Sequence, residues 1–128
     1  MSVKVDLNKE EKTKSKLEEW AEYFKIVGSP LRLMIILALY SSEILKRESH
    51  SLTFSEIKLI SGVSSEETLA YHLRQLESVN FIRKDPYKDE SNGRVYPLYH
   101  ISDKGSRFLT DLGLVDILQE YLRKILTP

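Results

Sequence analysis

The sequence has no cysteine among its 128 residues, which excludes disulfides, thiolate metal sites and cysteine nucleophiles. A chain of this kind suits a reducing interior, so we expect a cytoplasmic protein. Its five glycines are scattered and form no phosphate-binding loop. The longest apolar run, residues 33–40, is much shorter than the ~20 residues that a membrane-spanning helix needs. It therefore predicts a buried helix.

An excess of charge of one sign is also missing, because 19 Lys and Arg residues balance 19 Asp and Glu residues. A zero net charge gives no overall attraction to nucleic acid, so any such binding would depend on local basic patches. The charged N-terminus, MSVKVDLNKEEKTKSK, lacks the apolar core of a signal peptide. We expect residues 1–8 to be flexible and residues 9–128 to form a single domain, which the length allows.

Catalytic arrangements are missing as well. The three histidines, His50, His72 and His100, belong to no His-x-x-x-His or Glu-x-x-His pattern. The sequence therefore predicts a protein that is not an enzyme and that has neither a metal site nor a cofactor.

Two helices are predicted in the first third of the chain. Apolar residues recur at helical spacing from Leu17 to Val27, with Lys and Glu on the other face, and Gly28 ends this helix. Pro30 then occupies the first position of a helix that runs to about Lys46. Because this second helix is apolar nearly all round, we expect it to lie at the centre of the domain.

Two short helices separated by a tight turn follow. Residues 53–56, TFSE, form a Ser/Thr-x-x-Glu capping box for a helix that ends at Gly62. Residues 64–67, SSEE, repeat this box, so we expect Ser64 to cap the next helix, which runs to about Ser78. The leucines of this second helix lie on one face, which predicts burial of that face.

A hairpin and a final helix complete the chain. Two β-rich segments flank a polar turn that contains Asn92-Gly93, and they predict a hairpin. Pro97 in the second strand indicates a sheet edge or a bulge. Ser102 can cap a helix that runs to about residue 126, in which Gly113 is a candidate for a bend or a break. Apolar residues cover more than one stripe of this helix, so part of it requires a partner.

Three stretches together resemble the ArsR-like and MarR-like winged helix-turn-helix transcription regulators, and more loosely the small archaeal regulators of this type. They are GSPLRLMIILAL, LTFSEIKLISGVSSEETLAYHLRQLESVNFI and YHISDKG, and the resemblance covers roughly residues 20–108. It implies an α+β, mostly helical fold, in which long N- and C-terminal helices form a dimer interface. The helix-turn-helix would span about 54–79, the wing about 81–101 and the C-terminal dimerisation helix about 102–126.

Two departures from the family pattern bear on the fold and on metal sensing. Asn80 stands where family members usually carry Gly before the wing, and Asn also tolerates a left-handed conformation. The Cys and His ligands of the metal-sensing ArsR branch are missing, so the resemblance does not extend to metal sensing.

By this resemblance, the second helix of the helix-turn-helix enters the major groove and the wing contacts the minor groove or the backbone. The candidate DNA contacts are Ser65, Glu66, Thr68, Leu69, Tyr71, His72, Arg74 and Gln75 on the helix and Arg83, Lys84, Lys88 and Arg94 on the wing. Arg74 could pair with guanine and Gln75 with adenine. His72 could equally be a packed histidine, and the polar residues could simply face water.

Two glutamates at the start of this helix are unusual beside phosphate. Glu67 falls three residues after Ser64, where its carboxylate can reach back to the Ser64 N–H and face the positive helix end. Glu66 has no such structural role. It could accept a hydrogen bond from a cytosine amino group, in which case it would tune specificity rather than prevent binding.

The terminal helices carry more apolar residues than a small core needs, and a large exposed apolar surface usually marks an interface. The candidate interface residues are Leu17, Trp20, Phe24, Leu114, Leu118, Tyr121, Leu122 and Ile125. A two-fold homodimer would place its reading helices about one DNA turn apart.

The sequence thus predicts a sequence-specific, double-stranded DNA-binding transcription regulator that acts as a homodimer and associates with the nucleoid. The alternative is a winged-helix protein-interaction module without sequence-specific DNA binding, which zero net charge and the two glutamates favour. An effector pocket at the dimer interface is a further alternative, for which the sequence carries no ligand signature.

Overall fold

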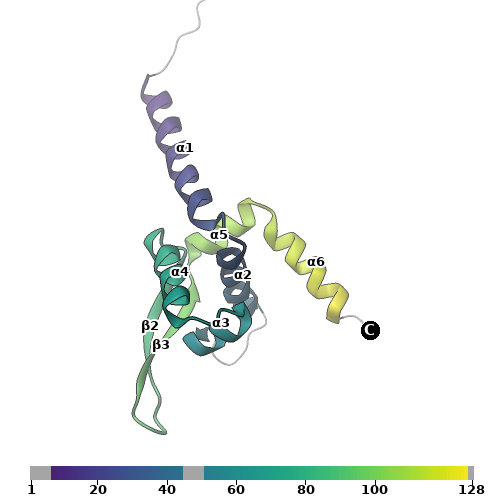
Figure 1. Ribbon diagram of the computed structural model, residues 1–128. Coiled ribbons are helices and arrows are strands. Elements are labelled where there is room, and N and C mark those ends of the chain that lie inside the picture. The colour runs from purple at the N-terminus through teal and green to yellow at the C-terminus, as the bar shows by residue number, and fades with distance from the viewer. Residues whose placement is uncertain (1–6, 45–50, 127–128) are drawn as a thin grey trace, which may run out of the picture.

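The computed structural model describes residues 7–44 and 51–126, and it contains a helical body from which α1, α6 and a long hairpin extend (Figure 1). In chain order the elements are α1 (Leu7–Val27), α2 (Pro30–Ile44), β1 (Leu52–Thr53), α3 (Phe54–Ser61), α4 (Glu66–Ser78), β2 (Ile82–Lys88), β3 (Val95–Ile101), α5 (Asp103–Asp111) and α6 (Leu114–Leu126). The predicted flexible N-terminus lies outside the described residues except for Leu7 and Asn8, which begin α1.

A sharp corner separates α1 from α2. Gly28 follows α1, and a Cβ atom at that position would lie 2.8 Å from the carbonyl oxygen of Phe24, so the corner requires glycine. Pro30 begins α2 as predicted. Within the described ranges no single helix is long and apolar enough to cross a membrane, and the only combination that approaches such a span, α1 with α2, is bent by 95°.

Local capping explains where α3 begins and ends. The Thr53 hydroxyl accepts from the Glu56 N–H at 3.1 Å, and the Glu56 carboxylate accepts from the Thr53 N–H at 3.1 Å. Gly62 ends the helix in the left-handed conformation, with φ 72°. The predicted capping box and helix end are therefore confirmed.

The predicted cap of α4 is wrong by one residue. Ser65, not Ser64, has the extended backbone of an N-cap, and its hydroxyl accepts from the Thr68 N–H at 3.3 Å. Glu67 is consequently the second helical residue rather than the third, so it does not close a capping box. Glu66 and Glu67 both lie in the first turn, where carboxylates interact favourably with the helix dipole.

Three antiparallel strands form the sheet in the order β1-β3-β2. The two-residue strand β1 was not predicted, because two residues are too few to show periodicity. Leu98 is the last β3 residue that β1 reaches, so the β1 side of β3 is unpaired at Pro97. β3 is nevertheless the middle strand of the sheet and pairs with β2 in continuous register, so the predicted edge position or bulge is wrong for the strand as a whole. Across the hairpin, Pro97 pairs with Pro86 of β2.

The core lies where α2 meets α1, α3, α4 and the sheet. The largest fully buried side chains are Phe81, Ile35, Ile36, Leu39, Ile57, Leu69, Leu73, Leu76 and Leu109. Aromatic rings extend this core toward α5, with centroids 4.7 Å apart for Phe81 and Phe108. Asn80, just before Phe81, has φ 61°, which confirms the left-handed conformation expected there.

The C-terminal region predicted as a helix over residues 102–126 forms two helices, so Gly113 breaks the helix, one of the two outcomes that the sequence allowed. Gly113, with φ 73°, lies between α5 and α6, and a left-handed residue cannot continue an α-helix. The two helices have different surroundings. Phe108 and Leu109 of α5 are buried in the core, whereas α6 extends away from the body (Figure 1).

Candidate nucleic-acid interface

The second helix of the helix-turn-helix, α4, has one buried face and one exposed face. Leu69, Leu73 and Leu76 are fully buried. Thr68 and Tyr71 are exposed on the opposite side, and the exposed side continues to Arg74. The burial of Leu69 confirms the predicted leucine face, and it removes this residue from the candidate DNA contacts because its side chain packs in the core. The remaining exposed residues are spaced to contact a groove along one side of the helix.

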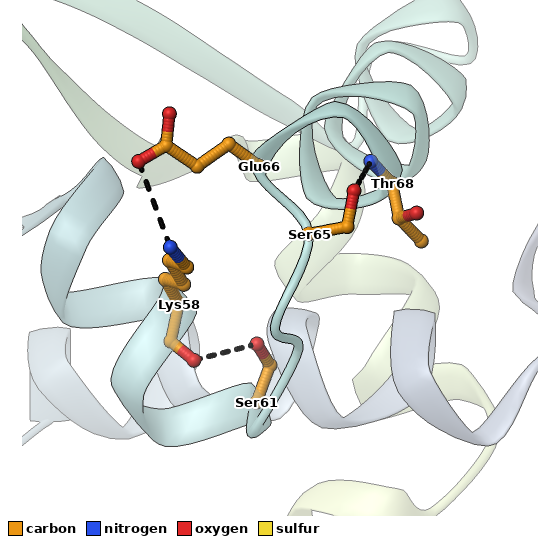
Figure 2. Close-up of polar contacts among 5 residues, drawn as sticks. All are labelled: Lys58, Ser61, Ser65, Glu66 and Thr68. Carbon is orange, nitrogen blue, oxygen red and sulfur yellow. Dashed lines mark hydrogen bonds and ion pairs between the residues drawn. The ribbon is translucent and has the colours of Figure 1, made fainter.

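The α3–α4 turn brings Glu66 against a residue of the preceding helix (Figure 2). The Lys58 ammonium of α3 lies 3.5 Å from the Glu66 carboxylate. Ser65 uses its hydroxyl as the helix cap. Glu66 therefore has a structural partner that the sequence analysis missed. No local pattern marks Lys58, because the ion pair forms only when the turn brings the two helices together.

A second inter-helix contact fixes His72. The Nε of Arg32 in α2 donates to Nδ1 of His72 at 3.0 Å, and its Nη1 donates to the Ile26 carbonyl at 2.8 Å. The guanidinium also lies 5.6 Å from the centroid of the Tyr71 ring. Burial, and secondly the Arg32 charge, hold the pKa of His72 below its ordinary value. Because Nδ1 of His72 already accepts a hydrogen bond from Arg32, this geometry favours a histidine packed within the protein over one that contacts DNA.

Arg74 and Gln75 differ in how accessible they are. Arg74 is exposed, and no described residue forms an ion pair with it. Gln75 is half-buried, and its backbone carbonyl accepts from the Ser78 hydroxyl at 2.6 Å. Arg74 is therefore the cation on α4 that is available to an external partner.

One face of the wing has an internal charge network. Arg83 of β2 stands opposite His100 of β3. The Asp85 carboxylate lies 3.1 Å from Nε2 of His100 and 3.9 Å from Nε of Arg83. Arg83 is thus partly neutralised within the hairpin. Because side chains alternate along a strand, Lys84 and Lys88 lie on the opposite face, where both are exposed.

The wing tip is ordered by backbone contacts that leave Arg94 exposed. The Asp89 N–H donates to the Arg94 carbonyl at 2.8 Å, and the Arg94 N–H donates to the Asn92 side chain at 2.9 Å. Hydrogen bonds from the Ser91 hydroxyl and N–H lower the pKa of Asp89. The tip therefore holds a carboxylate in place while the Arg94 guanidinium faces solvent.

The candidate interface residues of α1 lie partly outside the core. Leu17 is 66% exposed, and Phe24 is also exposed. Trp20 is half-buried, with its ring centroid 5.3 Å from that of Phe108. The exposed apolar surface of α1, formed by Leu17 and Phe24, thus adjoins the packed side chain of Trp20.

In α6, Leu114 packs against the core, whereas Ile117, which was not among the candidates, is largely exposed. The other candidates on this helix have side chains outside the described part of the structure: Leu118, Tyr121, Leu122 and Ile125.

An open cleft of about 630 Å³ lies between α1 and α5. Aromatic side chains, among them Trp20 and Phe108, line it together with charged residues that include Lys104 and Arg107. Lys104 lies with its ammonium 4.6 Å from the centroid of the Tyr23 ring. Among the described residues, no group of three or more His, Asp or Glu side chains could hold a metal ion.

Comparison with known proteins places these features in a common fold. Residues 20–109 match the family model described as a domain of unknown function, DUF7347. No curated protein matches the chain. A homodimeric winged helix-turn-helix DNA-binding domain from Mycobacterium bovis, Mb0332, is 17% identical, with a TM-score of 0.58 and coverage of 97% of this chain and 95% of that one.

Two further structures have the same fold at low identity. The transcriptional regulator YodB from B. subtilis, in its reduced form, is 20% identical, with a TM-score of 0.56 and coverage of 83% of this chain and 90% of that one. A MarR family transcriptional regulator from Silicibacter pomeroyi is 15% identical, with a TM-score of 0.55 and coverage of 95% and 74%. At these identities the likeness shows the winged helix fold, as the sequence predicted.

Proposed function

Since the chain belongs to the DUF7347 family and has the winged helix fold of transcription regulators, we propose that it is a sequence-specific, double-stranded DNA-binding transcription regulator. The exposed face of α4 is the observation that carries this proposal. Its buried leucines fix the helix in the body, and its outward residues, Thr68, Tyr71 and Arg74, follow one side at groove-reading spacing.

In the proposed complex, α4 enters the major groove. Arg74 has the fork geometry that pairs with guanine, and it is free of competing ion pairs among the described residues. Arg94 at the wing tip is suited to phosphate or to the minor groove. Lys84 and Lys88 supply charge for backbone contacts. Zero net charge confines attraction to these local groups.

We propose that the regulator acts as a homodimer through its terminal helices. The exposed Leu17 and Phe24 of α1 and the exposed Ile117 of α6 support this, because a monomer would leave them in water. The structure from Mycobacterium bovis is described as homodimeric, which is consistent with the proposal. The predicted candidates at the end of α6 extend the same interface.

The proposal places the protein in the cytoplasm and in contact with the nucleoid, without enzymatic activity or a cofactor. The resemblance to archaeal regulators, seen in the sequence motifs, stays a prediction. The cleft between α1 and α5 is the place where an effector could act on the terminal helices.

A protein-interaction module is the second candidate function. Leu59 of α3 is 84% exposed and its neighbour Ile60 is also exposed, both close in sequence to the turn before α4. An apolar pair at this position would suit a protein surface better than phosphate. In that case the same helix-turn-helix would dock onto a protein rather than read DNA.

Fluorescence-anisotropy titration tests the proposal. A labelled duplex carrying the region upstream of the protein's own gene is compared with a scrambled duplex across a salt series. Binding at micromolar concentration or tighter, with a preference for the upstream duplex and a steep fall with salt, supports a DNA-binding regulator. Absence of binding to both duplexes at low salt, from folded protein, would favour the protein-interaction module.

A further inference from the structure

Local hydrogen bonds hold the turn between α3 and α4 in one conformation. The backbone positions of the two charged residues that flank the turn, Lys58 and Glu66, are therefore fixed. The Lys58 carbonyl accepts from the Gly62 N–H at 3.1 Å and from the Ser61 hydroxyl at 3.2 Å. On the other side of the turn, the Ser65 hydroxyl caps α4 (Figure 2). Because these backbone positions are fixed, only the side chains of Lys58 and Glu66 lose freedom when the ion pair forms.

The two partners of this ion pair differ in how freely they can move. The Lys58 side chain is 33% exposed, whereas that of Glu66 is 74% exposed. Lys58 lies in the last turn of α3 and Glu66 in the first turn of α4, so each charge also suits the dipole of its own helix. The lysine is thus held in place, and the glutamate is the partner that can turn away.

Any polyanion that approaches the start of α4 meets both groups, because their charged atoms are 3.5 Å apart. While Glu66 stays on Lys58, its carboxylate repels phosphate and occupies the ammonium. When Glu66 finds a donor of its own, such as the amino group of cytosine, the ammonium becomes available. Exposed ion pairs are weak, so this exchange of partners requires little energy.

We propose that Glu66 masks Lys58 in the free protein, and that base reading by Glu66 releases Lys58 to bind a backbone phosphate. The proposal rests on the proposed DNA-binding function and adds Lys58, which no sequence pattern indicated, to its contacts. On an unrelated sequence Glu66 has no base to bind and stays on Lys58, so the phosphate contact is lost. The pair thereby disfavours the wrong sites as well as favouring the right one.

Charge-neutralising variants separate this mechanism from a general charge effect. Glu66→Gln removes the mask, and Glu67→Gln is the matched control, since it makes the same charge change in the same helical turn. Lys58→Met keeps the aliphatic stem while removing the charge, both alone and combined with Glu66→Gln. Circular dichroism establishes that each variant folds, and anisotropy titrations on the preferred and the scrambled duplex give the affinity and the salt slope.

Glu66→Gln is expected to strengthen binding to the scrambled duplex by roughly three- to tenfold and to steepen its salt slope by about 0.9, the value for one added phosphate contact. The gain on the preferred duplex should be smaller, so discrimination falls. Combining the change with Lys58→Met should remove the gain and the added slope. Glu67→Gln should leave the salt slope within about 0.3 of wild type.

Equal gains in affinity for the scrambled duplex from Glu66→Gln and Glu67→Gln would overturn the inference, because a general charge effect would then explain both. Persistence of the gain in the Glu66→Gln, Lys58→Met double variant would overturn it as well. In both cases the wild-type protein still binds DNA, so the proposed function stands. Failure of the wild-type protein to bind either duplex would instead overturn the proposed function, and this inference with it.

Discussion

The helix α4 and the wing are both proposed to contact DNA, but they are held in place in different ways. α4 is fixed by buried leucines and by the Arg32–His72 hydrogen bond to α2. Beyond the pairing of β1 with Tyr99 and Leu98, the wing is held by its own strand pairing, its tip and the Asp85 network. Base reading requires side chains held in one geometry, whereas phosphate contacts need little more than positive charge.

The largest effect is expected from a core-facing leucine of α4. Leu73 is fully buried, so Leu73→Ala should lower the free energy of unfolding by about 2–5 kcal/mol. Val95→Ala in the wing, where the side chain is mostly exposed, should change it by less than about 0.5 kcal/mol. Chemical denaturation of the two variants provides the measurement. Equal losses would show that the wing is as integral to the fold as the helix.

A smaller loss, in DNA affinity rather than stability, is expected at Arg74. Arg74→Ala should weaken binding to the preferred duplex by about 1–3 kcal/mol and relax the choice of base at one position. Arg74→Lys keeps the charge but loses the two parallel donors of the guanidinium. It should therefore recover affinity for the scrambled duplex without restoring discrimination between the two duplexes. Titrations against duplexes with single base changes test both variants. An unchanged preference in Arg74→Ala would remove this residue from base reading.

At the wing tip, Arg94→Ala should weaken binding to all sequences alike, by about 0.5–1 kcal/mol, and reduce the salt slope by about 0.9. Lys88→Ala is the comparison within the same hairpin, since Lys88 lies at the end of β2 rather than at the tip. The salt slope of each variant is the deciding quantity. If Arg94→Ala altered discrimination rather than the slope, the wing would read sequence and the contrast with α4 would disappear.

The smallest effect is a loss of stability on acidification that depends on His72. Its pKa is lowered by burial and by Arg32, so the folded state binds this proton less tightly than the unfolded chain does. The stabilisation is therefore fully present above the ordinary value of 6.5 and is lost as the pH falls through the lower folded pKa. Protonation would also place a hydrogen on the Nδ1 atom that accepts from Arg32.

Denaturation at pH 7 and at pH 5 measures this effect in wild type and in His72→Asn, whose side-chain oxygen can still accept from Arg32. The variant should lose less stability between the two pH values than the wild type does. Identical losses would mean that other groups carry the pH dependence and that the Arg32–His72 contact does not depend on protonation.

Local signals in the sequence were sufficient for much of the fold. The Thr53 capping box, the left-handed Asn80 and the leucine face of α4 each depend on neighbours within one helical turn or on backbone geometry. Such signals can be read without knowing the tertiary structure. The one-residue error at Ser64 arose because two adjacent serines offer the same chemistry, and only the backbone conformation chooses Ser65.

The features that escaped prediction depend on distant residues or on very short elements. Arg32 and His72 are separated by 40 positions, so helical periodicity says nothing about their hydrogen bond. Lys58 meets Glu66 only because Gly62 turns the chain between α3 and α4. At Gly113 the sequence allowed either a bend or a break, and the left-handed backbone makes it a break.

The paired prolines of the wing have a consequence for solubility. Pro86 lies in β2, which is an edge strand of the sheet, and Pro97 stands opposite it on β3. A proline has no backbone N–H, so both positions lack a donor that a strand from another molecule would need. Charged neighbours such as Lys84 and Lys88 add repulsion. A long exposed hairpin, normally a hazard for edge-to-edge aggregation, is thereby protected at its paired prolines.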